Sequence, residues 1–121
     1  MATQYLGRPM TAPIEHLDTI PAPGGAGKIT MTCDEVTAHC PVTGQPDFYN
    51  VVIEYIPDAL CVESKSLKLY LWHLRERRIF CEHLAAEIAD TVMAQVQPHS
   101  CIVTVRQNVR GGISITAEAN W

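Results

Sequence analysis

The spacing of apolar residues changes twice along this chain, and that order of spacings most limits what the chain can fold into. From Lys28 the apolar residues alternate with threonine, and the segment from Phe48 to Ile56 alternates again, with Tyr49, Val51, Ile53 and Tyr55 on one face. A period of two is typical of half-buried strands. The intervening segment, residues 39–47, contains two prolines and a glycine and is predicted to be a loop.

The spacing then lengthens to that of helices. Leu67, Leu71 and Leu74 recur at intervals of three or four residues, so a first helix is expected from about Ser64 to Arg77, capped by Ser64. A second helix is expected to end at Pro98. Its apolar positions are Phe80, Leu84, Ile88, Val92 and Val96. The short connection makes the two helices antiparallel neighbours.

Two more strands are expected near the C-terminus, Cys101 to Arg106 and Ile113 to Thr116, joined through Arg110-Gly111-Gly112. The order ββααββ predicts the α+β class, an antiparallel sheet with two antiparallel helices on one face. Such a sheet has two free edges, which native proteins cover or blunt. We therefore expect a homo-oligomer.

The length of 121 residues corresponds to a single domain. Residues 1–27 contain four prolines and the run Gly24-Gly25-Ala26-Gly27, which disfavour regular structure, so they are predicted to form a flexible N-terminal arm. Residues 28–121 are predicted to form one catalytic domain.

Composition excludes several classes of protein. A net charge of −4 argues against nucleic acid as a partner. No apolar stretch approaches the roughly 18 residues of a membrane span and no secretory signal is seen, so a cytoplasmic protein without a membrane partner is expected. The five cysteines are odd in number and widely spaced, which argues against a disulfide framework and raises the question of a reactive thiol.

Cys40 and Asp47 are the strongest candidates for chemistry, because they bring a nucleophile and a carboxylate into one predicted loop. A thiolate attacks an electrophilic carbon, and a nearby carboxylic acid supplies the proton that the reaction needs. Taken singly, Cys40 is equally compatible with a buried small side chain, and Asp47 is more typical of a turn.

Charged groups near the predicted helix ends indicate a binding site. Glu63 and Glu82 flank the first helix, and a carboxylate can accept two N–H bonds from the edge of a guanine-like ring. For Glu82, favourable placement in a first helical turn is the stronger reading from sequence. Lys65, Lys68 and Arg110 are best placed to hold phosphates, although a solvated helix face is the commoner explanation for such lysines.

Cofactor and metal motifs are sparse. No Gly-x-Gly-x-x-Gly follows a strand, so a Rossmann-type site is not expected. The possible zinc ligands match no recognised spacing, so no metal is expected. They are Cys33, His39, Cys40, Cys81 and His83. A noncatalytic or metal-dependent pterin or purine binder remains an alternative class.

Three segments together resemble a known enzyme family. They are Cys40-Pro41-Val42-Thr43-Gly44-Gln45-Pro46-Asp47-Phe48, Glu63-Ser64-Lys65-Ser66-Leu67-Lys68-Leu69-Tyr70 and Arg110-Gly111-Gly112-Ile113-Ser114-Ile115. They are similar to segments of the NADPH-dependent 7-cyano-7-deazaguanine reductases of queuosine biosynthesis, of the short single-module type, and the similarity extends from Lys28 to Trp121.

The resemblance implies a tunnelling fold whose subunits form rings with active sites between them. It implies that Cys40 attacks the nitrile carbon to form a thioimide, that Asp47 protonates the nitrile nitrogen, and that two hydrides from NADPH give 7-aminomethyl-7-deazaguanine. It assigns the small-molecule deazapurine substrate to Val62, Glu63, Ser64, Cys81 and Glu82. It assigns the cofactor to Lys65, Lys68 and Arg110.

One position departs from the family pattern, because Cys81 stands where many members have histidine before the glutamate matched by Glu82. His83 cannot replace it, since two residues along a helix turn a side chain to nearly the opposite face. The archaeal relatives use the same thioimide to transfer ammonia onto modified tRNA, so an amidine-forming transferase is the alternative function. They lack the lysine motif, which therefore favours reduction.

Overall fold

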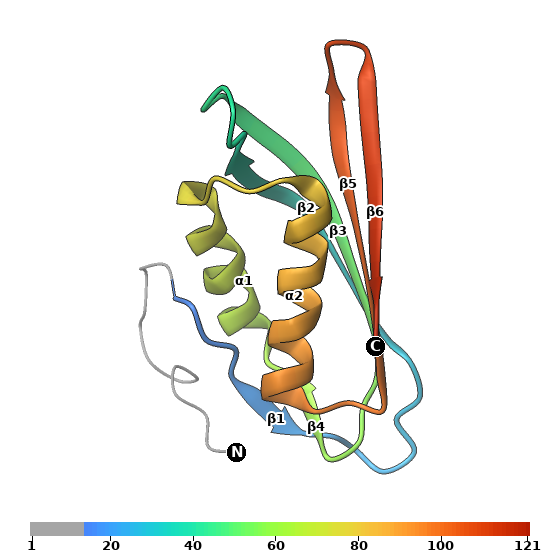
Figure 1. The fold of residues 1–121 in the computed structure, drawn as a ribbon. Helices are drawn as coiled ribbons and strands as arrows, with labels where there is room; N and C mark the ends of the chain where they lie inside the picture. The colour runs from blue at the N-terminus through green and yellow to red at the C-terminus, as the bar shows by residue number, and fades with distance from the viewer. Residues whose placement is uncertain (1–13) are drawn as a thin grey trace.

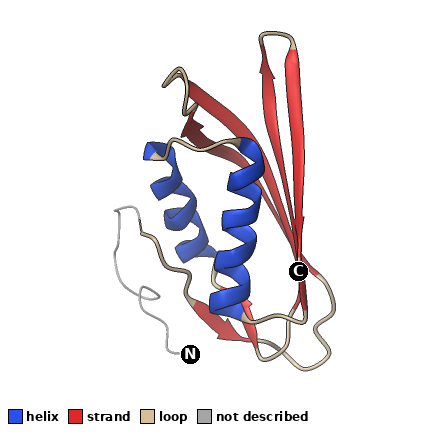
Figure 2. Ribbon diagram, in the orientation of Figure 1, coloured by secondary structure: helices blue, strands red, loops and turns tan. Residues whose placement is uncertain are grey.

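The computed structural model describes residues 14–121 and contains an antiparallel sheet covered on one face by two helices (Figure 1; Figure 2). The sheet has the strand order β2-β3-β5-β6, and every neighbouring pair is antiparallel. Its strands are β2 (Ile29–His39), β3 (Pro46–Ile56), β5 (Ser100–Arg110) and β6 (Ile113–Asn120). The α+β class is confirmed. The order ββααββ holds for the strands of this sheet and the two α-helices, and β5 and β6 are longer than predicted.

The two helices are α1 (Ser64–His73) and α2 (Cys81–Val96), joined through the short 3-10 helix η1 (Leu74–Glu76). The first helix is therefore shorter than expected. Its cap is Glu63 and not Ser64, because the Glu63 carboxylate accepts hydrogen bonds from the backbone N–H groups of Lys65 and Ser66. A carboxylate also interacts favourably with the positive end of the helix dipole. Glu63 therefore both accepts hydrogen bonds from free N–H groups of the first turn and adds a favourable charge there.

The core lies between the helices and the sheet. The four β3 residues predicted to share a face are all buried, at 1% exposure or less, and they pack with residues of β5 and α2. The β3 residues are Tyr49, Val51, Ile53 and Tyr55. The period-two pattern thus identified the inner face of the sheet correctly.

The N-terminal segment contains regular structure at residues 19–21, where none was expected. β1 (Thr19–Pro21) pairs antiparallel with β4 (Leu60–Val62), a short strand that was also not expected. Ile14 and Leu17 are buried beside it. Pro21 is tolerated at the end of this strand because the next hydrogen bond to the partner is made by Ala22, whose N–H donates to the carbonyl of Ala59 at 2.9 Å. Residues 1–13 of the predicted arm lie outside the described part of the chain.

The free edges of the large sheet are β2 and β6, as predicted. Several large apolar side chains near the ends of the sheet strands are exposed. They are Phe48, Ile56, Val109, Ile113 and Trp121. Neither helix of residues 14–121 is long and apolar enough to span a bilayer.

Candidate active site

Cys40 lies in the tight loop that joins β2 to β3. Its backbone N–H donates to the carbonyl of Gln45, and its carbonyl accepts from the N–H of Gly44, both at 2.9 Å. Gly44 has φ of +72°, a left-handed conformation that glycine adopts without strain. These bonds close the loop around the Cys40 side chain, which is only 6% exposed.

The loop favours the thiolate form of Cys40. The Thr43 hydroxyl, followed by the backbone N–H groups of Thr43 and Val42 and the Arg110 side chain, lowers the pKa of the Cys40 thiol to about 7, against the opposing effect of burial. Hydrogen bonds to an anion stabilise the charged form. A large fraction of this thiol is therefore ionised at neutral pH, as a nucleophile requires. The sequence analysis missed Thr43, although a hydroxyl three residues after the cysteine in a proline- and glycine-containing loop is a usable signal.

Asp47 is held from two sides. It is the second residue of β3 and not a turn residue, and its side chain is 4% exposed. Its Oδ1 is paired with the Arg110 guanidinium, and its Oδ2 accepts a hydrogen bond from the Tyr49 hydroxyl at 3.4 Å. Burial, followed by the charge of Asp47, raises the pKa of Tyr49 strongly, so this phenol remains a donor. Tyr49 is a second residue that the sequence pattern showed only as core.

The start of α2 lies beside this loop. The backbone N–H of His39 donates to the carbonyl of Arg77 at 2.8 Å, and the backbone carbonyl of His39 accepts from the N–H of Ile79 at 3.1 Å. These bonds connect the end of β2 to the segment that precedes α2. Glu82 is exposed in the first turn of α2. Cys81 is 1% exposed, and its thiol donates to the carbonyl of Val105 at 3.6 Å. The Cys81 thiol therefore points into the core, and its side chain is not available to a substrate from the surface.

A second group of predicted site residues surrounds the junction of β4 and α1. Val62 is buried and Ser64 is exposed. The Glu63 carboxylate is 8% exposed, with Oε2 accepting from Lys65 N–H at 2.7 Å and Oε1 from Ser66 N–H at 2.8 Å. Each carboxylate oxygen can accept a further bond, so the cap leaves room for N–H groups of a ligand.

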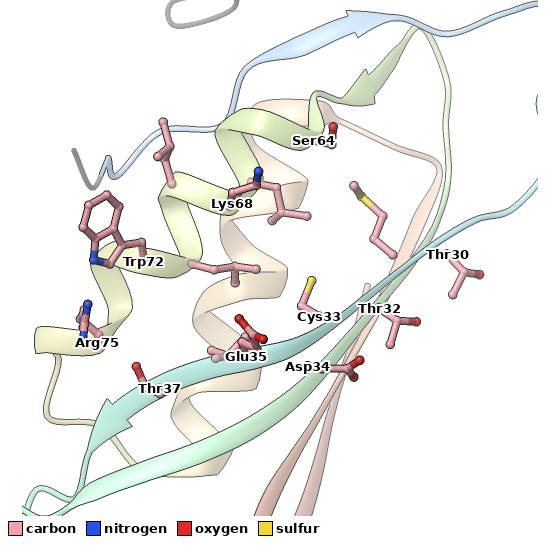
Figure 3. A pocket seen from close by; sticks show the side chains of 15 residues that line it. Thr30, Thr32, Cys33, Asp34, Glu35, Thr37, Ser64, Lys68, Trp72 and Arg75 are labelled. Atoms are coloured by element: carbon pink, nitrogen blue, oxygen red, sulfur yellow. The ribbon is translucent and has the colours of Figure 1, made fainter. Parts of the chain in front are cut away.

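A groove runs between α1 and β2, next to the free edge of the sheet (Figure 3). Ser64, Lys68, Trp72 and Arg75 line it from the helical side, opposite β2 residues from Thr30 to Thr37. Its volume of about 1220 Å³ exceeds the roughly 300–1,000 Å³ typical of ligand pockets. The groove is therefore large enough for a dinucleotide. Lys68 and Arg75 supply positive charge on its helical side, and Asp34 and Glu35 of β2 also line it.

The two groups lie at opposite ends of α1 (Figure 1). Glu63 precedes the first residue of α1, whereas the Cys40 loop is tied to Arg77 and Ile79, beyond η1. The ten residues of α1 and the three of η1 together rise about 20 Å. One flat bicyclic ring cannot bridge that distance, so a single subunit does not bring Glu63 to Cys40.

The residues predicted to hold the cofactor phosphates are divided in the same way. Lys65 and Lys68 belong to α1, whereas Arg110 ends β5 and contacts Cys40 and Asp47. The three therefore do not meet within one subunit. Among residues 14–121 there is also no group of three or more His, Cys, Asp or Glu side chains arranged to hold a metal ion.

The chain is similar to proteins of known identity. Residues 46–121 match the family described as "QueF-like protein". The NADPH-dependent 7-cyano-7-deazaguanine reductase of Syntrophus aciditrophicus (strain SB) is 50% identical over 111 residues, covering 90% of this chain and 79% of the relative. The enzyme of the same name from Frankia casuarinae is 42% identical over 121 residues, covering 100% and 97%, and that from Halorhodospira halophila is 45% identical over 111 residues, covering 90% and 94%.

A solved structure also resembles the chain. The crystal structure of the archaeosine synthase QueF-Like in the apo form superposes with a TM-score of 0.74 at 25% identity, covering 79% of this chain and 94% of that one.

Proposed function

The chain belongs to the QueF-like protein family, and from that premise we infer that it is an NADPH-dependent 7-cyano-7-deazaguanine reductase. It reduces the nitrile of 7-cyano-7-deazaguanine to the primary amine in queuosine biosynthesis. Its fold is the tunnelling fold that the resemblance predicted. The observation that carries the assignment to particular residues is an acidified cysteine, Cys40, in the same cluster as the carboxylate of Asp47.

Cys40 is the proposed nucleophile, because its loop stabilises the thiolate near neutral pH. Its sulfur bonds to the nitrile carbon, one carbon–nitrogen π bond breaks, and Asp47 delivers a proton to the nitrile nitrogen. The product of this step is a covalent thioimide. Burial of Cys40 and Asp47 limits access of water to the adduct.

NADPH, when bound, supplies the two hydrides that separate a nitrile from an amine. The residues present fit a cofactor with phosphates: Lys65 and Lys68 lie three positions apart on α1, and Lys68 lines the groove along that helix. Arg75 adds a further positive charge to the same groove. We propose that these α1 lysines hold the cofactor phosphates.

Val62, Glu63, Ser64 and Glu82 are the proposed ligands of the deazaguanine ring, with Cys81 contributing through its backbone. Because Glu63 and Cys40 of one subunit are too far apart for one ring, the complete site is proposed to form between subunits. The free edges of β2 and β6 and the exposed apolar side chains at the strand ends support assembly into a homo-oligomer. The cysteines Cys33, Cys40, Cys61, Cys81 and Cys101 are all unpaired, which supports a cytoplasmic location.

Mass spectrometry of the intact protein tests the assignment. Purified protein mixed with 7-cyano-7-deazaguanine in the absence of NADPH is expected to gain the full mass of the substrate, and peptide mapping is expected to find the gain on Cys40. The variant Cys33→Ser is a matched control and should still gain the mass of the substrate. Cys33 is an unpaired cysteine that lines the groove, away from the Cys40 loop. A wild-type spectrum with no adduct argues decisively against the nitrile as substrate.

The transferase alternative is tested by the same protein. The structural neighbour named as an archaeosine synthase shares the fold at 25% identity, whereas the relatives named as reductases are 41–50% identical. A reductase oxidises NADPH only when the nitrile is present. Turnover with ammonia and no NADPH oxidation would instead indicate the amidine-forming reaction.

A further inference from the structure

Arg110 occupies an unexpected position for a residue of a cofactor site. It is the last residue of β5, directly before the Gly111-Gly112 turn, and a register shift separates it from Gln107 in the pairing with β6. Its guanidinium pairs with Oδ1 of Asp47 and lies near the Cys40 thiol, whose pKa it helps to lower. A guanidinium carries five N–H donors in a planar fork, so one side chain can hold both groups at once.

The contacts have an electrostatic consequence. The Asp47 side chain is 4% exposed and the Cys40 residue 6%, so a carboxylate and a thiolate here have little water to separate their charges. Two like charges in one buried cluster oppose each other's ionisation unless a positive charge lies between them. The other titratable or charged groups around the cluster are Tyr49 on β3, Cys81 and Glu82 on α2, and Arg78 next to Gly44. Arg110 is the cation among these residues that pairs with Asp47 and also stabilises the Cys40 thiolate.

We propose that Arg110 is a positioning residue for thioimide formation, which holds the Cys40 sulfur and the Asp47 carboxylate together for proton transfer, and is not a ligand of the cofactor. This proposal rests on the proposed function and deepens it. In the step, the thiol S–H bond breaks and its proton passes to Asp47. The sulfur electron pair forms the S–C bond, one C–N π bond breaks, and the nitrile nitrogen takes the proton from Asp47. Atoms and charge balance, no electron donor is needed, and Arg110 is unchanged.

Two readouts test the proposal without NADPH. The first is the rate of Cys40 alkylation by iodoacetamide across pH, followed by peptide mass, which does not depend on the nitrile being the substrate. In Arg110→Ala, loss of the donor leaves the Asp47 charge uncompensated beside the sulfur. The pH midpoint of alkylation is expected to rise by about one unit, with a roughly fivefold lower rate at pH 7. The second readout is single-turnover adduct formation with 7-cyano-7-deazaguanine, which is expected to slow in parallel.

Two variants keep the test decisive. Arg110→Lys retains a positive charge but lacks the planar guanidinium that can reach both Asp47 and Cys40. Its pH midpoint of alkylation is expected to lie between those of wild type and Arg110→Ala. Arg106→Ala, which alters an exposed arginine on the same strand, is expected to behave as wild type. If Arg110→Ala alkylates and forms the adduct as wild type does, while its KM for NADPH rises, the proposal is overturned and Arg110 is a cofactor ligand. If wild type alkylates with a midpoint near 7 but forms no adduct, the proposed function fails. The alkylation midpoints of wild type and Arg110→Ala still test whether Arg110 stabilises the Cys40 thiolate.

Discussion

The backbone carbonyl of Asp18 accepts a hydrogen bond from the backbone N–H of Glu63 at 2.9 Å, so the N-terminal segment braces the start of α1. The N–H of Asp18 donates in turn to the Ser66 hydroxyl at 2.8 Å. Leu17, one residue earlier, is fully buried and donates its N–H to Oε1 of Gln95 in α2 at 2.6 Å. The segment before β1 is thus part of the framework that orients the Glu63 carboxylate.

Leu17→Ala should reveal this contribution. Removing a fully buried leucine side chain destabilises a domain by about 2–5 kcal/mol, whereas Ile20→Ala, at a side chain that is 39% exposed, should have a much smaller effect. The free energies of unfolding from urea titrations provide the comparison. Equal, small effects of both substitutions would mean that the segment is a dispensable arm after all.

Thr43→Ala should shift the pH dependence of the enzyme. The Thr43 hydroxyl is the largest contribution that lowers the pKa of Cys40 to about 7, so its removal raises that pKa toward the ordinary thiol value. The thiolate fraction at pH 7 then falls, and the rising limb of kcat/KM against pH moves to higher pH by roughly one unit. Activity at high pH should recover.

Thr43→Ser is the matched variant, since it keeps the hydroxyl and should retain the wild-type profile. Thr116→Ala, at an exposed position on β6, controls for loss of a threonine elsewhere. An unshifted profile in Thr43→Ala would remove the hydroxyl from the account of thiol activation.

Glu63→Gln and Glu63→Ala should separate capping from substrate binding. Alanine removes both cap hydrogen bonds, from Lys65 and Ser66, and should destabilise the protein by about 1 kcal/mol. Glutamine keeps one acceptor oxygen for the cap but has lost the second acceptor and the charge that a guanine-like edge requires. Both variants should lose substrate affinity, measured by calorimetric titration, and the alanine variant should lose more stability than the glutamine variant. Wild-type affinity in Glu63→Gln would exclude Glu63 from the substrate site.

Mixing two inactive variants should restore activity if sites form between subunits. A Cys40→Ala subunit still supplies Glu63, and a Glu63→Gln subunit still supplies Cys40. After dissociation and random reassembly, about a quarter of the shared sites contain both intact residues, so about a quarter of wild-type activity should return. Each variant reassembled alone is the control. No recovery, with mixed oligomers shown by native mass spectrometry, would place both residues in the same subunit's site.

Lys65→Ala and Lys68→Ala should raise the KM for NADPH more than the KM for the nitrile, because removal of a phosphate contact weakens cofactor binding. Lys28→Ala is the control, since Lys28 pairs with Glu54 at 3.6 Å, on β3 and away from α1. Steady-state kinetics with each substrate varied in turn provides the measurement. Equal changes in both KM values would remove the lysines from the cofactor site.

Much of the fold was predictable from local periodicity. The alternation in β3 and the helical spacing of α2 each reflect a single face that must be buried, and both elements agree with the structure. The strand β1 was not predictable in this way, because its three residues show no period and its prolines suggested a loop. Its formation depends on β4, which is about forty residues away in the sequence.

The candidate site also has some features that were predictable from the sequence and others that depend on tertiary structure. The sequence alone identified the two candidate reactive groups, because a cysteine and an aspartate flanking a short proline- and glycine-containing loop must lie close together wherever that loop is placed. Only the tertiary structure decided that Arg110 lies against Cys40 and Asp47, that the Cys81 thiol faces the core, and that Glu63 lies at the far end of α1. These relationships arise from the pairing of β3 with β5 and from the packing of α2 on the sheet. Contacts between residues distant in sequence depend on the shape of the whole core, which no local pattern encodes.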